Sequence, residues 1–408
     1  MSSNRPDEIF RRRVFYIPGY DPIHPRRYRE LYRKEGAAQA TISGYEIDLS
    51  AKTGTGPYGW HVRSVQDGQR IEADVEVLVW SDIVRDSMSN SIPEAYLQML
   101  RTAWIYISSG ALWRLMRLRK GPVIAALYPV VMLLGQLLLA VGLGWLVFCT
   151  MALLPLGIAS LVGAVAALFA CTVLLRWFRA RDGRFFAYYL MHDYAYSAQL
   201  RGANPPALEV RLAEFRDQID AALHSDVDEV LVVGHSSGAH LGVSVLADLI
   251  RAGNLPKDGP ALGFLSLGQV VPMVSFLPRA QRLRRDLHAL STSDALAWID
   301  VSAPGDGCAF ALCDPVTVSG VARAGKRWPL VFSAAFTQTL SPERWRALRW
   351  RFFRLHFQYL CAFDRPGDYD YFRITAGPMT LASRYAARAP SKSRIDVPVS
   401  KYTSMDAA

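Results

Sequence analysis

One long stretch of the sequence lacks charge altogether. Between Gly121 and Leu175 there is no Asp, Glu, Lys, Arg or His. A membrane-spanning helix needs about 20 apolar residues, so this run holds two spans and a tight turn. We expect the spans near residues 122–147 and 152–175, with the turn around residues 148–156. The alternative is a helical hairpin buried in a soluble core, but such cores rarely contain apolar runs of this length without one charge.

Cysteine is scarce, and its spacing excludes its usual structural roles. The five cysteines are scattered, and none forms a CxxC pair; they are Cys149, Cys171, Cys308, Cys313 and Cys361. An odd, scattered set argues against a disulfide framework and against a zinc site. The first residues, MSSNRPDEIFRRR, lack the apolar core of a secretory signal. We therefore expect the protein to reside in a reducing compartment.

The excess of positive charge, +10 overall, is concentrated partly around the apolar run. Basic residues precede the first expected span and follow the second: Arg114, Arg117, Arg119 and Lys120, then Arg176, Arg179, Arg181 and Arg184. Positive charge at both ends of a hairpin places both ends in the cytoplasm. We expect two spans, cytoplasmic termini and the inner membrane of a bacterium as the location. Without zinc-knuckle, RNP-like or KH-like motifs, the expected partner is a lipid bilayer rather than nucleic acid.

Aromatic and basic residues continue on both sides of the apolar run, at residues 103–118 and 177–194. Side chains of this kind sit well at the depth of lipid headgroups. They would equally well pack against a soluble domain. The sequence does not separate these two interpretations.

The rest of the chain alternates between strand-like and helix-like segments, which predicts an α/β fold with a mainly parallel sheet flanked by helices. Strands are expected at residues 14–17, 40–48, 60–65, 75–80, 229–233, 264–271, 297–301 and 329–336. Helices are expected at residues 25–35, 207–223 and 237–252, with another that begins at Ser341 and breaks near residues 351–355.

This pattern predicts one α/β domain with the membrane hairpin inserted into it. Residues 1–100 would form its first part, residues 101–194 the insertion, and residues 195–388 its second part. Within the second part we expect a cap over the site at residues 272–297. Residues 389–408, rich in Pro, Ser and small side chains, are predicted to be a loose tail.

Residues 229–242 read EVLVVGHSSGAHLG, a short apolar strand followed at once by a glycine-bracketed serine. Gly-x-Ser-x-Gly between a buried strand and a helix is the pattern of a nucleophile elbow. The turn is so sharp that side chains at Gly234 and Gly238 would collide with neighbouring elements. Such a turn lifts the Ser236 hydroxyl clear of the sheet. The alternative is an ordinary strand-to-helix turn.

Together with VFYIPGYDP at residues 14–22, this motif resembles the α/β-hydrolases. The resemblance implies a serine hydrolase whose triad follows the order serine, acid, histidine. It also implies an oxyanion loop at residues 16–22, where Gly19 allows close backbone approach. The N–H groups of Tyr20 and Ser237 would then hold the oxyanion. Pro18 departs from the family, where histidine is common, and an ordinary Pro-Gly turn is the alternative.

The acid and base follow from the order that the family implies. Asp306 lies in WIDVSAPGDGCAF, in a glycine-bracketed turn after an expected strand; Asp300 and Asp314 are the weaker candidates, and Asp306 alternatively only shapes the turn. His356 is the only histidine after Asp306 and takes the position of the base. The other seven are set aside by their position: His24, His61, His192, His224, His235, His240 and His288.

These residues predict a membrane-anchored serine hydrolase. His356 would take the proton of Ser236 as that hydroxyl attacks an acyl carbonyl, with Asp306 fixing the imidazole. No metal and no organic cofactor is expected. Because a water-soluble ester needs no membrane anchor, the expected substrate is a lipid or acyl ester in the adjacent leaflet. The alternatives are an acyltransferase with the same triad and an inactive scaffold.

Overall fold

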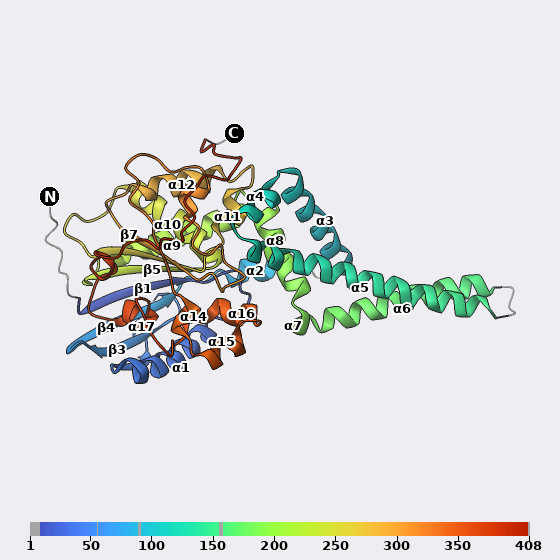
Figure 1. Cartoon of the computed structure of the whole chain (residues 1–408), viewed down its shortest axis with the longest axis horizontal. Helices are drawn as coiled ribbons and strands as arrows, with labels where there is room; N and C mark the ends of the chain where they lie inside the picture. Colours follow the sequence, from blue (N-terminus) through green and yellow to red (C-terminus); the bar gives the residue numbers. More distant parts are fainter. Residues whose placement is uncertain (1–8, 55, 89–90, 155–157, 407–408) are drawn as a thin grey trace.

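A mixed eight-stranded sheet forms the centre of the computed structural model, which describes residues 9–54, 56–88, 91–154 and 158–406 (Figure 1). Its strand order is β2-β3-β4-β1-β5-β6-β7-β8. The strands are β1 (Arg11–Ile17), β2 (Glu46–Ala51), β3 (Gly59–Gln66), β4 (Gln69–Val77), β5 (Glu229–His235), β6 (Ala261–Leu267), β7 (Ala297–Ser302) and β8 (Leu330–Ser333). Only β3 runs antiparallel to its neighbours, so the predicted, mainly parallel sheet is confirmed.

Helices cover both faces of the sheet, because alternate residues of its central strands are apolar on opposite sides. Val14 and Tyr16 of β1 pack against α1 (Arg26–Ser43) and α17 (Tyr371–Ala376). Phe15 and Ile17 face α9 (Pro206–Leu223), α10 (Ser237–Ala252) and α12 (Gln281–Ser291). The remaining short helices are α2 (Ser81–Ser87), α11 (Val271–Ser275), α13 (Pro315–Val318), α14 (Phe336–Thr339), α15 (Pro342–Leu348), α16 (Phe352–His356), η1 (Phe357–Leu360) and α18 (Leu381–Tyr385).

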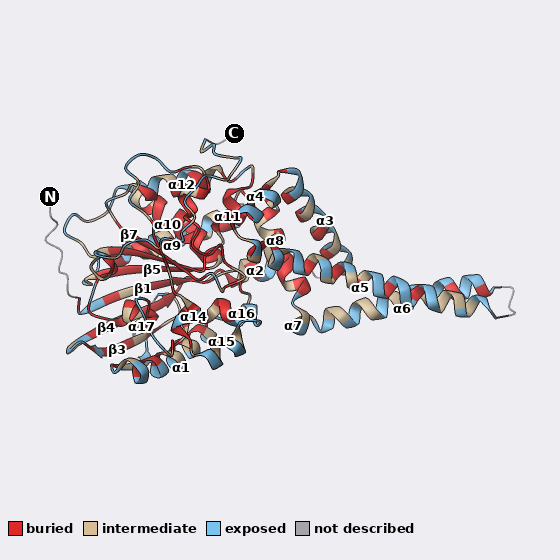
Figure 2. Ribbon diagram, in the orientation of Figure 1, coloured by how far each residue is buried: buried red, intermediate tan, exposed pale blue. Residues whose placement is uncertain are grey.

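The uncharged run forms two long helices, α5 (Lys120–Ala152) and α6 (Ala159–Ala180), which project from one end of the domain (Figure 1). Both are long and apolar enough to cross a membrane. Their apolar side chains are largely uncovered (Figure 2), so the alternative of a hairpin buried in a soluble core is wrong. Ala152 belongs to the first helix rather than the second. Pro155 and Gly157, placed in the expected turn, lie outside the described residues.

The aromatic segments beside the hairpin form α3 (Ile92–Ser108), α4 (Ala111–Leu118), α7 (Asp182–Phe185) and α8 (Ala187–Ala198). Trp104 and Trp113 are 72% and 59% exposed. Tyr106 is buried against the domain, whereas Tyr188 is buried among α3, α5 and α8. Packing therefore accounts for some of these side chains, and a position of the exposed ones at headgroup depth stays a prediction.

Several expected element boundaries were wrong. The strand expected at residues 75–80 is β4, which ends at Val77, and the one expected at residues 329–336 is β8, which ends at Ser333. Residues 40–43, expected in a strand, continue α1, and Gly44 in the left-handed conformation ends that helix with its amide bonded to the Ala40 carbonyl. A left-handed glycine is a common helix terminator, and the strand begins only afterwards. β6 ends at Leu267, residues 268–270 form a loop, and Val271 already begins α11.

The expected loose tail is also wrong, because residues 389–406 run across the domain. The amide of Ile395 donates to the Leu312 carbonyl at 2.7 Å, and the Asp314 amide donates back to the Ile395 carbonyl at 2.9 Å. Further along, the Arg284 guanidinium donates to the Ser404 carbonyl at 2.7 Å. These bonds use backbone groups of the tail, which small residues and prolines leave accessible.

One buried ion pair joins the two central strands at their amino ends. Arg12 of β1 lies 2.6 Å from Glu229 of β5, and both side chains are fully buried. The guanidinium also donates to the carbonyls of Gly377 and Met379, while Glu229 accepts from the Leu381 amide. Because every charged group has partners, the pair fixes the C-terminal segment onto the sheet.

We expect the Glu229→Gln variant to lose about 3–5 kcal/mol of unfolding free energy, because it leaves the Arg12 charge buried without its partner. Urea unfolding of the full-length protein in detergent micelles measures this loss. Arg11→Gln is the matched control, since it removes a neighbouring ion pair to Asp226 that is exposed. The control should cost about 1 kcal/mol or less. Equal losses in both variants would contradict the role given to the buried pair.

Candidate active site

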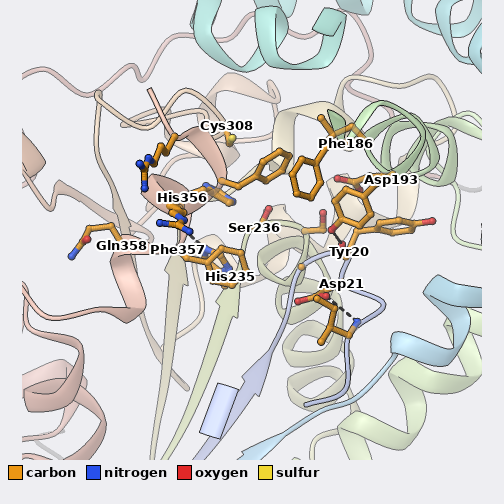
Figure 3. A pocket seen from close by; sticks show the side chains of 18 of the residues that line it. Tyr20, Asp21, Phe186, Asp193, His235, Ser236, Cys308, His356, Phe357 and Gln358 are labelled. Carbon is orange, nitrogen blue, oxygen red and sulfur yellow. Dashed lines mark hydrogen bonds between the residues drawn. The ribbon is translucent and has the colours of Figure 1, made fainter. Parts of the chain in front are cut away.

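A cavity of about 1100 Å³ lies at the carboxyl end of the central strands. Its walls come from the loop after β1, from the turn after β5, from α8 of the insertion and from residues 344–361 (Figure 3). Ligands of open α/β sheets bind at this end of the strands. Both Ser236 and His356 line the cavity.

Ser236 sits between β5 and α10 in a strained conformation, with φ of 56° and ψ of −121°. Such a backbone costs on the order of 1–3 kcal/mol and persists only where the surroundings enforce it. The flanking glycines explain how the surroundings enforce this conformation. A Cβ atom at Gly234 would lie 2.6 Å from the Gly238 carbonyl oxygen, and one at Gly238 would lie 2.0 Å from that of Ile17. The ordinary turn considered as the alternative does not require this strain.

His356 and Asp306 form a buried pair. The His356 Nδ1 lies 2.7 Å from the Asp306 carboxylate, which also accepts from the Tyr359 hydroxyl at 3.0 Å and from the Cys308 amide at 2.9 Å. Burial by itself raises the pKa of Asp306, but the facing His356 and these hydrogen bonds outweigh it and lower that pKa below its usual value. The carboxylate therefore stays ionised and holds the Nδ1 proton.

The other ring nitrogen of His356 is left available. Within the described part of the chain, its Nε2 is buried and has no hydrogen-bond partner. The ring is held in place from two sides. It packs on His235 at a centroid distance of 4.7 Å, and Gly268 leaves room for it, since a Cβ there would lie 3.1 Å from the ring. An unpaired buried Nε2 in the cavity of a strained serine is suited to accept a proton.

His235 supports this arrangement without titrating near neutral pH. Its Nε2 lies 3.0 Å from the His356 carbonyl oxygen, to which a neutral ring donates. Burial, and next the neighbouring His356, lower the pKa of His235 to about 3. The ring is thus uncharged and positions the backbone of His356.

The loop after β1 brings backbone amides to the serine. A Cβ at Gly19 would lie 3.0 Å from the Ser236 Cβ and 3.4 Å from its hydroxyl, so only glycine fits there easily. The Tyr20 carbonyl accepts from the Tyr189 hydroxyl, but among the described residues the Tyr20 amide has no acceptor. Ser237 is the first residue of α10, where amides lack partners within the helix. Both amides are free to bind an oxyanion.

The weaker acid candidates do not line the cavity. Asp300 accepts from the Ser266 hydroxyl at 2.7 Å, and burial raises the pKa of Asp300 to about 8. Asp314 caps α13 and pairs with Lys326. Of the eight histidines, only His235 and His356 line the cavity. His356 ends α16, after a break between α15 and α16, close to where the sequence predicted a break.

The expected cap does not cover the site. Of residues 272–297, only Met273 lines the cavity, because α12 packs against α10 on the sheet. The cover comes instead from α8, which contributes Tyr189, Leu190 and Asp193.

Asp193 is a residue of the site that sequence reasoning missed. Its carboxyl lines the cavity, and in the described part of the chain it has no ion-pair or hydrogen-bond partner (Figure 3). Burial raises the pKa of Asp193 to about 7, and the neighbouring His356 offsets part of this effect. A lone acid in the aromatic run MHDYAY was the available signal.

One group of side chains has the composition of a metal site. Ligand atoms of Asp306, Cys308 and His356 lie within 4.8 Å of one another. Burial raises the pKa of the Cys308 thiol well above its usual value, so the thiol stays protonated and is a poor ligand. A metal there would also have to replace the hydrogen bond between His356 and Asp306.

No protein-family model matches this chain, and neither does any curated protein or any solved structure. The function therefore has to be inferred from the geometry of the site.

Asp193→Asn removes an ionisable group while keeping its shape. The pKa of Asp193 is raised from 3.8 to about 7 in the folded protein, so the wild type loses stability as the pH rises through this interval. We expect the variant to melt at a higher temperature than the wild type above pH 7, with the difference vanishing near pH 4. Melting curves of both proteins in detergent test this, since shared titrations such as that of His235 cancel. A difference that does not change with pH would contradict it.

Proposed function

We propose that this protein is a membrane-anchored serine hydrolase that cleaves acyl esters of lipids at the cytoplasmic leaflet. The observation that carries the proposal is the strained Ser236 in one cavity with the His356–Asp306 pair and its unpaired Nε2. The α/β-hydrolase resemblance fits this geometry. In that family the oxyanion hole uses the amide after the nucleophile and one from a strand-to-helix loop, and Ser237 and Tyr20 occupy such positions.

The reaction follows from these positions. His356 Nε2 takes the hydroxyl proton as Ser236 Oγ bonds to the acyl carbonyl carbon, and the amides of Tyr20 and Ser237 hold the oxyanion. The imidazolium then returns the proton to the leaving alcohol, and the ester bond breaks. Water, deprotonated by His356, releases the acyl group and restores Ser236. Asp306 stabilises the charged imidazole throughout.

The membrane anchor follows from the exposed apolar surface of α5 and α6. Leu138 and Phe169 are 72% and 71% exposed, and no other part of the described chain covers them. Such surface is stable in lipid rather than in water. The basic clusters at both ends of the hairpin favour a cytoplasmic domain.

A fluorophosphonate probe tests the nucleophile. We expect the wild type to be labelled at Ser236 and Ser236→Ala to remain unlabelled. Ser197→Ala is the matched control, because Ser197 lines the same cavity. Mass spectrometry of the labelled peptide identifies the site. A folded wild type that ignores the probe would refute the proposal and favour the inactive scaffold.

The base is tested by kinetics. His356→Asn should lower kcat on a short-chain ester by roughly 10³-fold to 10⁴-fold, because the serine then has no proton acceptor. His224→Asn, an exposed histidine outside the cavity, should retain the wild-type rate. Products analysed with and without an added lipid alcohol distinguish hydrolysis from acyl transfer. A His356→Asn rate close to that of the wild type would remove His356 from the mechanism.

A further inference from the structure

Some cationic side chains of the cavity form ion pairs, and others do not. Arg27 pairs with Asp21 at 3.2 Å, and Arg344 lies within 3.5 Å of Glu35. Three further cations line the cavity without an ion pair or side-chain hydrogen bond to any described residue: Lys34, Arg351 and Arg354. Acids line the cavity in equal number: Asp21, Glu30, Glu35, Asp182 and Asp193. All but Asp193 have partners among the described residues, since Glu30 pairs with Arg33 and Asp182 accepts from the amides of Tyr188 and Tyr189. The three cations therefore remain available to a negatively charged ligand.

These three cations are solvent-exposed, which places them at the opening of the cavity, whereas Ser236 lies inside. Lys34 comes from α1, and the two arginines come from the start of α16 and the residue before it. Asp193, the unpaired acid, lines the same cavity from α8 (Figure 3). Three cations without partners in the described chain favour negative charge on a ligand near them, whereas the unpaired carboxyl of Asp193 disfavours it in the part of the cavity lined by α8.

The opening lies close to the base of the hairpin. Pro122 at the start of α5 lines the cavity, and so do Asp182 and Gly183 just after α6. Figure 1 shows α16 and α7 at the end of the domain from which α5 and α6 project. If the hairpin spans a bilayer, the opening lies near the level of the lipid headgroups.

Exposed aromatic side chains accompany the two arginines. Trp350 is 73% exposed and Phe352 is 47% exposed, in the segment Arg349-Trp350-Arg351-Phe352-Phe353-Arg354. Aromatic rings favour the membrane interface, and guanidinium groups bind phosphate through paired hydrogen bonds. Deeper in the cavity, Leu190, Met273 and Phe357 provide apolar walls for an acyl chain.

We infer that Lys34, Arg351 and Arg354 bind the phosphate of an anionic phospholipid, so that the enzyme selects acidic over zwitterionic lipids of the bilayer. This inference rests on the proposed hydrolase function and specifies its substrate class. The apolar walls then direct the acyl ester of the bound lipid toward Ser236. A zwitterionic lipid carries its own cation beside the phosphate, which these three residues repel.

The test uses full-length protein reconstituted in vesicles that contain phosphatidylglycerol and phosphatidylcholine with differently isotope-labelled acyl chains. Mass spectrometry of the released fatty acids gives the ratio of the two cleavage rates. We expect the wild type to prefer phosphatidylglycerol by about tenfold or more, and Lys34→Gln/Arg351→Gln/Arg354→Gln to lose most of that preference. Both lipids are present in the same vesicles, so a smaller fraction of folded enzyme lowers both cleavage rates and does not alter their ratio.

The matched control is Lys257→Gln/Arg285→Gln/Lys392→Gln, which removes the same charge from exposed positions outside the cavity. It should keep the wild-type ratio. Equal cleavage of both lipids by the wild type, or an unchanged ratio in the cavity variant, would overturn the inference. An equally strong preference for a soluble anionic ester over a soluble zwitterionic one, measured without vesicles, would also overturn it, because the selection would then not concern lipids of the bilayer. The proposed function is judged separately, by probe labelling of Ser236.

Discussion

The contact between the end of β1 and the beginning of α10 is the constraint on which the candidate site depends. Gly238 touches the backbone at Ile17 so closely that no side chain fits between them. The same approach sets Gly19 against the Ser236 side chain. One backbone contact therefore fixes both the strained serine and the loop that packs against it. Because β1 and β5 are adjacent parallel strands, their carboxyl ends meet at this point although β2, β3, β4 and the inserted helices separate them in the chain.

The sequence predicted those parts of the site that depend on steric necessity or on chain order. Gly234 and Gly238 mark the sharp turn because only glycine fits at these positions. Asp306 and His356 were singled out by their order along the chain, and the structure brings them into a hydrogen bond. The mainly parallel sheet followed from the alternation of apolar segments, since each buried strand needs a covering helix on either side.

Features that depend on long-range contact had no comparable signal. The tail binds through its backbone amides and carbonyls, as at Ile395, and nearly any sequence provides these groups. The cap was assigned to residues 272–297 by position, although the cover of the site comes from α8, earlier in the chain. Asp193 lines the cavity that contains Ser236 only because α8 covers that cavity. The end of α1 is different, because Gly44 was a readable stop signal.

The inserted segment is part of the candidate site. Tyr189 of α8 donates to the Tyr20 carbonyl, and so holds the loop in which Gly19 packs against Ser236. α8 is itself tied to the hairpin, since Asp182, two residues after α6, accepts from the amides of Tyr188 and Tyr189. A tilt of α6 relative to the domain would therefore be transmitted through Asp182 to the cover of the cavity. These few hydrogen bonds connect the hairpin to the geometry around Ser236.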